Sequence, residues 1–345
     1  MTINYAQIFC SVAELVVDMQ TPGADEAGLF QRVREASDYL QKEFGWFIPV
    51  TTTRTLNGRG NQRLFVPPLL SITSITLYDG TVLNSADYIA LPEGGFWTNG
   101  PYSRLMIAPL SSHLDVWPNR EDGVQIAGLW GLYNLTRSTG AKVKDSPKQT
   151  SSQATLTVDN GANVSSGMVA LIGSEQELIT SWENPVDSTA DLNGGITATD
   201  AEITLTDASK VNIGEILRVG FEQMKVLDRN TTTQKLYVKR SWNGTQAAAH
   251  LTAADVYVYR TVKVERGMNG TAAAEHLTDV DISRYVVPDD ILFLVKENAT
   301  LMLNKAGSQY QGRTGKDDGV IFYNDAFSKP DIDRLKRIYR IPRIG

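Results

Sequence analysis

An internal repeat constrains this chain more than any other feature of its sequence. The phrase RSWNGTQAAAHLT occupies residues 240–252, and RGMNGTAAAEHLT occupies residues 266–278. In both copies Asn-Gly favours a tight turn with positive φ, Thr can cap that turn, and the alanines suit a compact helical turn or a close-packed loop. We therefore expect the phrase to have a structural role, and we expect each histidine to hydrogen-bond the loop backbone of its own module.

A second repeat indicates how the modules are arranged. Parallel stretches start at residues 154 and 201, and both contain Gly-x-Glu-Gln. Residues 201–260 hold every piece of one unit, whereas the pieces of the other copy are split between 154–183 and 261–287. This predicts one small β-domain inserted into another, or two interleaved halves. A tandem arrangement with a degenerate middle is the alternative.

Helical patterns flank the repeats at both ends of the chain. Apolar residues from Tyr5 to Met19 recur at helical spacing, which predicts a first helix. Thr21-Pro22 can start a second helix that ends at Gly45. Near the other end, residues 289–307 predict a long helix after Pro288, and a last short helix is expected from Ser328.

Short strands are expected between the first helices and the repeats. Asp79-Gly80 is a strong hairpin signal, and Asn57-Gly58 is a second possible hairpin tip. The Ser/Thr/Lys/Gly-rich stretch 136–154 has no periodic pattern of apolar residues and is predicted to be a linker. The expected strands are residues 63–68, 71–83, 88–91, 104–107 and 124–131.

Together these patterns predict an α+β fold: a helical core with a short-stranded β region and an inserted all-β repeat domain. The core is expected to comprise residues 1–137 and 288–345, and the insert residues 138–287. The net charge of −6 lies in residues 151–287, and the rest of the chain is neutral. The chain therefore lacks the broad basic surface of a general nucleic-acid binder.

Several classes of protein are not expected from the composition. No apolar run approaches the roughly 20 residues of a membrane helix, and the N-terminus lacks the basic region of a secretion signal. Cys10 is the single cysteine, so neither a disulfide within the chain nor a cysteine metal site is expected, and synthesis in the cytoplasm is.

Candidate chemical sites all favour plain structural interpretations. GSQYQGRT at 307–314 resembles a phosphate-binding loop, but Arg313 replaces the lysine and a helix precedes it. His250 and His276 lack further ligands at metal-binding spacing. His113 lies near Asp115 without a nucleophile. We expect no enzyme, no cofactor and no metal.

Tryptophans offer one further candidate site. Trp97, Trp117 and Trp130 could form a carbohydrate platform, although core packing is the usual role of such residues beside strands.

The flanking segments carry a family resemblance. YLQKEFGWFIP leads into VPPLLSITSITLYDGTVLNSADYIALP and then to a Trp-Pro strand, and VVPDDILFLVKENATLML follows the insert. Over roughly residues 1–135 and 287–345 this order resembles the head-to-tail connector proteins of tailed bacteriophages. Their known members usually lack anything like the insert.

The resemblance implies a structural virion protein at the neck. It would form a ring, usually of twelve copies, between the portal protein and a tail-side neck or tail-terminator protein, and double-stranded DNA would pass through its lumen. The insert would project outward toward capsid or fibres. The alternative is a fibre- or collar-associated protein whose β modules bind glycan or another virion protein.

The resemblance also places docking to portal or tail on the C-terminal tail. There, basic residues would meet acidic grooves and apolar residues would anchor. The expected docking residues are Lys329, Arg334, Lys336, Arg337, Ile338, Tyr339, Arg340, Ile341 and Arg343.

Overall fold

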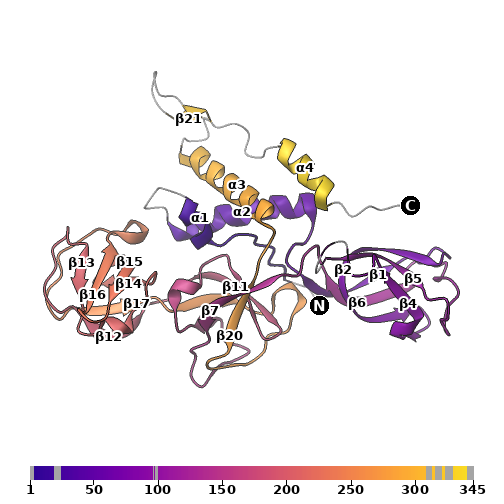
Figure 1. The fold of residues 1–345 in the computed structure, drawn as a ribbon, viewed down its shortest axis with the longest axis horizontal. Helices are drawn as coiled ribbons and strands as arrows, with labels where there is room; N and C mark the ends of the chain where they lie inside the picture. The colour runs from indigo at the N-terminus through magenta and orange to yellow at the C-terminus, as the bar shows by residue number, and fades with distance from the viewer. Residues whose placement is uncertain are drawn as a thin grey trace.

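The computed structural model arranges three β units beneath a layer of helices (Figure 1). It describes residues 4–18, 25–95, 97, 100–307, 313–314, 321–322 and 329–339. Of the described residues, 38% are in strands and 22% in helices. The predicted fold class, α+β around a helical core, is therefore wrong, because antiparallel sheets outweigh the helices.

The N-terminal sheet is antiparallel with the strand order β1-β6-β2-β5-β4, and β3 pairs with β2. Ile75 lies opposite Leu83, so the hairpin at Asp79-Gly80 is confirmed. The hairpin at Asn57-Gly58 is wrong, because β1 pairs with β6 instead of β2. The strands are β1 (Val50–Leu56), β2 (Arg63–Leu77), β3 (Val82–Leu83), β4 (Tyr88–Leu91), β5 (Tyr102–Ile107) and β6 (Val124–Trp130), with a short 3-10 helix at Ser85–Asp87.

The repeats form two six-stranded sheets with the same topology. The outer module (residues 136–183 and 261–285) has the order β7-β20-β10-β11-β18-β9, and the inner module (186–258) has the order β12-β17-β14-β15-β16-β13. Equivalent strands occupy equivalent places in the two orders. Because the inner module lies between β11 and β18 in the chain, the two modules are nested, one inside the other.

The strand bounds follow the repeat. The outer strands are β7 (Thr136–Lys142), β9 (Thr155–Thr157), β10 (Val169–Ile172), β11 (Glu175–Trp182), β18 (Thr261–Glu265) and β20 (Asp281–Tyr285). The inner strands are β12 (Val186–Asp191), β13 (Glu202–Thr204), β14 (Ile216–Val219), β15 (Glu222–Asn230), β16 (Lys235–Lys239) and β17 (Asp255–Val258). Two small pairs are β8 (Lys148–Gln149) with β19 (His276–Leu277) and β21 (Arg313–Thr314) with β22 (Ile321–Phe322).

Both modules begin earlier than the repeat comparison indicates. The stretch 136–154, predicted to be a linker, contains β7 and β8. It lacks an apolar period because β7 is an edge strand that buries Ala141 alone. The short 3-10 helices of the two modules also correspond, at Gly161–Asn163 and Ala208–Lys210, and at Met268–Gly270 and Trp242–Gly244.

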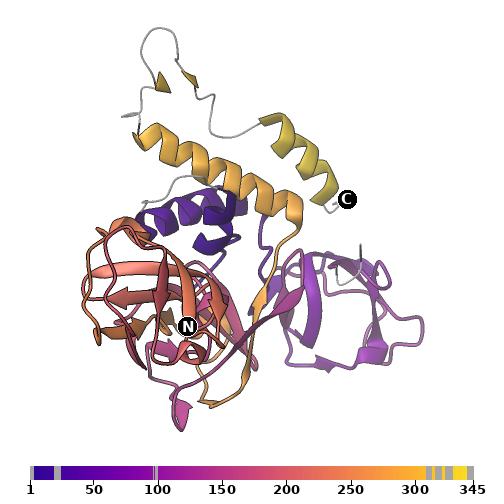
Figure 2. The same cartoon turned by 60° about the vertical axis from the view of Figure 1, so that its left-hand side comes forward.

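Helices from both ends of the chain pack into one layer, which Figure 2 shows above the modules. The first predicted helix is confirmed over Val12–Asp18, but its predicted start at Tyr5 is wrong: residues 4–11 are not helical, although residues 6–11 are buried. The predicted helix at 289–307 is confirmed. The helices are α1 (Val12–Asp18), α2 (Glu26–Phe44), α3 (Asp289–Gly307) and α4 (Lys329–Tyr339).

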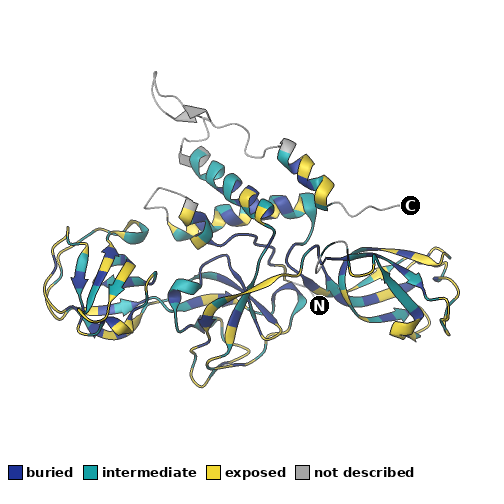
Figure 3. Ribbon diagram, in the orientation of Figure 1, coloured by how far each residue is buried: buried dark blue, intermediate teal, exposed yellow. Residues whose placement is uncertain are grey.

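One apolar core joins the helical layer to the outer module. Leu40 of α2, Val295 of α3 and Leu335 of α4 share this core with Leu178 and Met268 of the outer module. The inner module and the N-terminal sheet each have a separate core, and the outer module has a further core of its own. Dark blue buried residues mark these cores in Figure 3. The outer module is thus part of the body that carries the helices, and the inner module is the appendage.

Deleting the two modules should therefore have different effects. Removal of residues 184–260, with a short Gly-Ser bridge, should leave a folded protein, because Val186 and Val258 are paired and bring the two ends together. Removal of 138–287 should unfold the helical layer, because Leu178 and Met268 leave its core. Circular dichroism and thermal unfolding of both variants measure this. Equal loss of structure would contradict the boundary.

Candidate functional site

The duplicated phrase surrounds a buried glutamate in each module. In the outer module the fully buried Glu175 accepts hydrogen bonds from Arg266 Nε and Nη2, both at 2.8 Å, and from His276 Nε2 at 2.9 Å. The backbone amides of Gly267 and Ala274 donate to the same carboxylate at 3.0 and 2.8 Å. The two ends of the phrase thus place main-chain donors around a charge, and the alanines form no helical turn.

The inner module repeats this arrangement atom for atom. Glu222 accepts from Arg240 Nε at 2.6 Å and Nη2 at 2.7 Å, and from His250 Nε2 at 2.9 Å. The amides of Ser241 and Ala248 complete the shell. The expectation that each histidine bonds loop backbone is wrong, because in both modules the imidazole partner is a carboxylate.

The asparagine of the phrase forms the predicted turn. In the outer module it also holds another segment of the chain by hydrogen bonds to its backbone, an arrangement that we call the asparagine clamp. Asn243 and Asn269 have φ of 51° and 52°, as Asn-Gly predicts. In the outer module Asn269 N donates to Asn4 O at 2.7 Å, its Oδ1 accepts from Ala6 N at 2.9 Å, and its Nδ2 donates to Ala6 O at 3.1 Å. Asn269 therefore holds the chain's own N-terminal segment by its backbone.

A glutamine supports this clamp. Gln176 Oε1 accepts from Asn269 Nδ2 at 2.7 Å, and Gln176 Nε2 donates to Pro49 O at 2.9 Å. In the inner module Gln223 Oε1 likewise accepts from Asn243 Nδ2 at 2.9 Å, but Gln223 Nε2 donates to Tyr259 Oη at 3.0 Å, one residue past the end of the same module. The outer pair ties three parts of the chain together, and the inner pair does not.

The ionised state of the clusters follows from their partners. Burial alone would raise the pKa of Glu175, but the hydrogen bonds from Arg266 and His276 outweigh it and hold the pKa at about 2. The pKa of Glu222 is likewise held at about 2. Burial alone would lower the pKa of His276, but its bonds to Glu175 and Glu177 raise it to about 9.

The outer cluster has three groups of a kind that bind metals. Ligand atoms of Glu175, Glu177 and His276 all lie within 4.8 Å of one another. However, the guanidinium of Arg266 lies 2.8 Å from Glu175 Oε2 and 3.0 Å from Glu177 Oε1. A resident cation already fills the centre of the set, so the arrangement is an ion network that closes the module.

Protonated His276 should make stability depend on pH. Its pKa is raised above the unfolded value of about 6.5, so its contribution is complete below that pH and is lost as pH rises through about 9. Between pH 7 and 9 the free energy of unfolding should fall by on the order of 2 kcal/mol more than in His276→Gln. Urea unfolding at both pH values measures this difference, and parallel pH profiles would contradict it.

The two glutamines provide a matched pair of variants. Gln176→Ala should cost about 2–3 kcal/mol, because the amide links Asn269 to Pro49 in a buried site. Gln223→Ala should cost about 1 kcal/mol, because its partners are half-exposed. Urea unfolding compares the two. A larger loss for the inner variant would contradict the assigned clamp.

The other candidates from the sequence have structural surroundings. His113 Nδ1 lies 2.9 Å from Asp87 Oδ2, and its bond lowers the pKa of Asp87 to about 2. Ser112 Oγ contacts the same ring nitrogen at 3.1 Å, whereas a catalytic triad needs serine on the opposite one. Trp117 and Trp130 are fully buried, so they cannot form a carbohydrate platform. Residues 308–312 of the loop resembling a phosphate site lie outside the described residues.

Described residues of the proposed docking tail lie on α4, where several contact their own chain. Tyr339 packs edge-on against Phe47 and donates to Asp290 Oδ1 at 2.7 Å, and Lys336 pairs with Glu43. Arg334, Arg337 and Ile338 are exposed. The side chain of Lys329 and all of Arg340, Ile341 and Arg343 lie outside the described residues.

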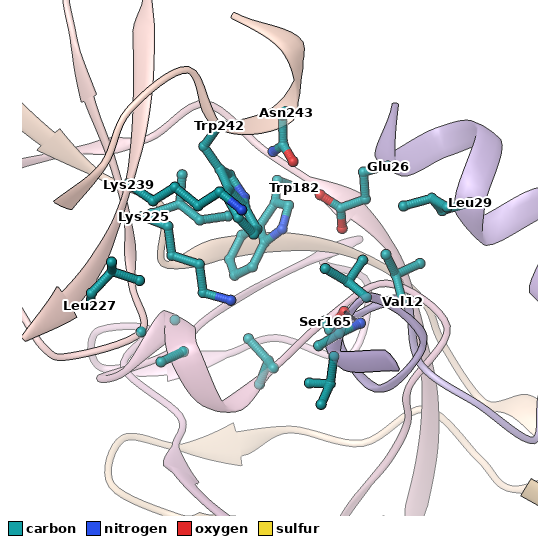
Figure 4. Close-up of a pocket in the computed structure, with 18 of the residues that line it drawn as sticks. Val12, Glu26, Leu29, Ser165, Trp182, Lys225, Leu227, Lys239, Trp242 and Asn243 are labelled. Atoms are coloured by element: carbon teal, nitrogen blue, oxygen red, sulfur yellow. Dashed lines mark hydrogen bonds between the residues drawn. The ribbon is translucent and has the colours of Figure 1, made fainter. Parts of the chain in front are cut away.

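A groove lies between the inner module, the outer module and the start of α2. It consists of adjoining cavities of about 310 and 520 Å³. Trp182, Asn243 and Glu26 line both cavities, and Lys225, Lys239 and Trp242 line the smaller one (Figure 4). Sequence reasoning missed this groove. The available signal was the set of positions at which the two copies of the repeat differ.

Comparison of the chain with protein-family models, with curated proteins and with solved structures finds no match. Among the described helices none is long and apolar enough to cross a membrane.

Proposed function

We propose that the chain is a structural subunit of a phage head-to-tail connector, which forms a ring between portal and tail through which DNA passes. The observation that carries the proposal is the joining of the two segments that hold the family resemblance. They are separated by the nested modules, yet α2, α3 and α4 share one core. Subunits of a ring contact one another through repeated surfaces, and helices joined by one core supply one continuous surface of this kind.

The arrangement of the charges supports a role in assembly. The exposed Arg334 and Arg337 lie on α4 beside the exposed Ile338, a combination suited to an acidic and apolar partner surface. The buried Glu175 and Glu222 are both fully engaged with arginine, histidine and backbone donors. These carboxylates are occupied in closing the modules, which suits a structural protein.

Imaging of the protein mixed with the portal from the same genome tests the proposal. We expect a ring capping the portal, with the inner modules projecting sideways. Truncation after Pro330 is a poor test, because it removes Ile332 and Leu335 from the core. A mixture of folded protein and portal that forms no complex would overturn the connector assignment.

Charge reversal on α4 tests the docking surface. Arg334→Glu with Arg337→Glu should weaken portal binding at least tenfold, because both side chains are exposed and their loss leaves the core intact. The matched control is Arg59→Glu with Arg63→Glu, two exposed arginines of the N-terminal sheet region. Sedimentation or surface plasmon resonance measures both. Equal effects of the two double variants would reject α4 as the docking element.

A further inference from the structure

The two modules share the glutamate, arginine and histidine of their buried ion clusters, although Glu177 joins only the outer cluster, and they differ on one face. Glu175, Arg266 and His276 have identical counterparts in Glu222, Arg240 and His250. The differences lie beside the clamp asparagine. There Leu178, Glu265 and Met268 of the outer module correspond to Lys225, Lys239 and Trp242 of the inner module.

In the outer module this face is covered by the chain itself. Leu178 and Met268 are buried in the core of the helical layer. Asn269 is completely buried and holds residues 4–6 through three backbone hydrogen bonds. Gly270 lies so close to the backbone of Thr51 that an added Cβ would meet its oxygen at 2.0 Å. The face is thus a site for an extended peptide, and the occupant is the N-terminal segment.

In the inner module the same clamp is formed but nothing in the described chain occupies it. Asn243 keeps the left-handed conformation and its bond to Gln223. Within the described residues, however, neither the backbone N–H of Asn243 nor its Oδ1 has a hydrogen-bond partner. The residue is half-buried and lines both cavities of the groove. In the outer module the equivalent groups of Asn269 are occupied: its backbone N–H donates to Asn4 O, and its Oδ1 accepts from Ala6 N.

Charge indicates what this groove accepts. The ammonium groups of Lys225 and Lys239 lie 4.6 and 5.4 Å from the centre of the Trp242 ring, and neither has an ion-pair partner in the described part of the chain. Burial and the neighbouring Lys239 lower the pKa of Lys225. Glu26 lines the opposite wall beside Leu29, as Figure 4 shows, and accepts a 2.5 Å bond from Ser166. Two adjacent cations favour an anionic group between them.

Strand pairing indicates how an occupant would be held. The groove-lining strands β11, β14, β15 and β16 each have a hydrogen-bonded neighbour on both sides. The backbone hydrogen-bonding groups of these strands are therefore already paired within the sheet, so an occupant cannot add to the sheet as a further strand. An occupant would therefore be recognised by the asparagine clamp and by the side chains that line the groove.

We propose that the inner module binds an extended acidic peptide segment of a partner protein, whose backbone is held by Asn243 as Asn269 holds residues 4–6, and whose carboxylate lies between Lys225 and Lys239. Hydrogen bonds to backbone give affinity without sequence preference, and the lysines select for acid. This inference does not depend on the connector assignment.

Selection from a yeast-displayed library of random octapeptides tests it with the full-length protein. We expect selected peptides to be enriched in Asp and Glu. Their affinity should fall at least tenfold in Asn243→Gly, which keeps the left-handed turn but removes the side-chain acceptor. It should fall similarly in the double variant Lys225→Leu with Lys239→Glu, which copies the outer module. Lys235→Ala, outside the groove, should leave affinity unchanged.

Each contrary result overturns the proposal. These results are the absence of any selected peptide, selection without acidic residues, or affinity that survives both groove variants while thermal unfolding shows them folded. Tighter binding of tetragalacturonic acid, lost in the same variants, would assign the groove to acidic saccharides. Self-association that depends on Asn243 would assign it to residues 4–7 of a second copy. If Asn243→Gly fails to fold, the lysine double variant decides.

Discussion

The pairing of a buried glutamate with an arginine that follows a strand distant in the sequence is the constraint on which the modular part of the structure depends. Glu175 and Arg266 are 91 residues apart, and the inner module lies between them. Removing one partner of such a pair leaves an uncompensated buried charge, which typically costs about 3–5 kcal/mol. The outer module therefore closes only when the intervening chain returns its ends to one place. The inner module does this, because β12 and β17 are paired at its boundary.

This constraint explains which residues the two copies share. A buried carboxylate needs several donors in fixed positions, so the glutamate, arginine, histidine and the turn that supplies backbone amides cannot vary separately. Residues outside that shell are free to follow their surroundings. Met268 became part of an apolar core, whereas Trp242 lies beside two lysines in a groove. The same scaffold thus serves as a structural joint in one copy and as an open surface in the other.

Sequence patterns predicted the elements whose environment is local. The helix at 289–307, the hairpin at Asp79-Gly80 and the turn at Asn-Gly follow from periodicity and backbone preference. The predicted start of the first helix at Tyr5 fails because tertiary contacts use that backbone: Asn269 holds Asn4 and Ala6, and Gln7 bonds Ile48. No local pattern reports a partner more than 260 residues away.

The site was predictable in part for the same reason. Identical Glu, Arg and His in both copies were visible, and a buried ion cluster could have been inferred from them. The groove could be found only by asking where the copies differ, and its far wall belongs to α1 and α2. The linker predicted at 136–154 fails because an edge strand with one buried residue has no apolar period.

The nesting also determines what a ligand in the groove would contact. The outer module holds α1 and the start of α2 directly: Val12 N donates to Ser166 O at 2.9 Å, and Ser166 Oγ donates to Glu26 Oε1. Val12 and Glu26 are also groove-lining residues. A segment bound in the groove would therefore contact α1 and α2, two elements of the helical layer. The appendage and the helical layer thus share a wall formed by α1 and α2.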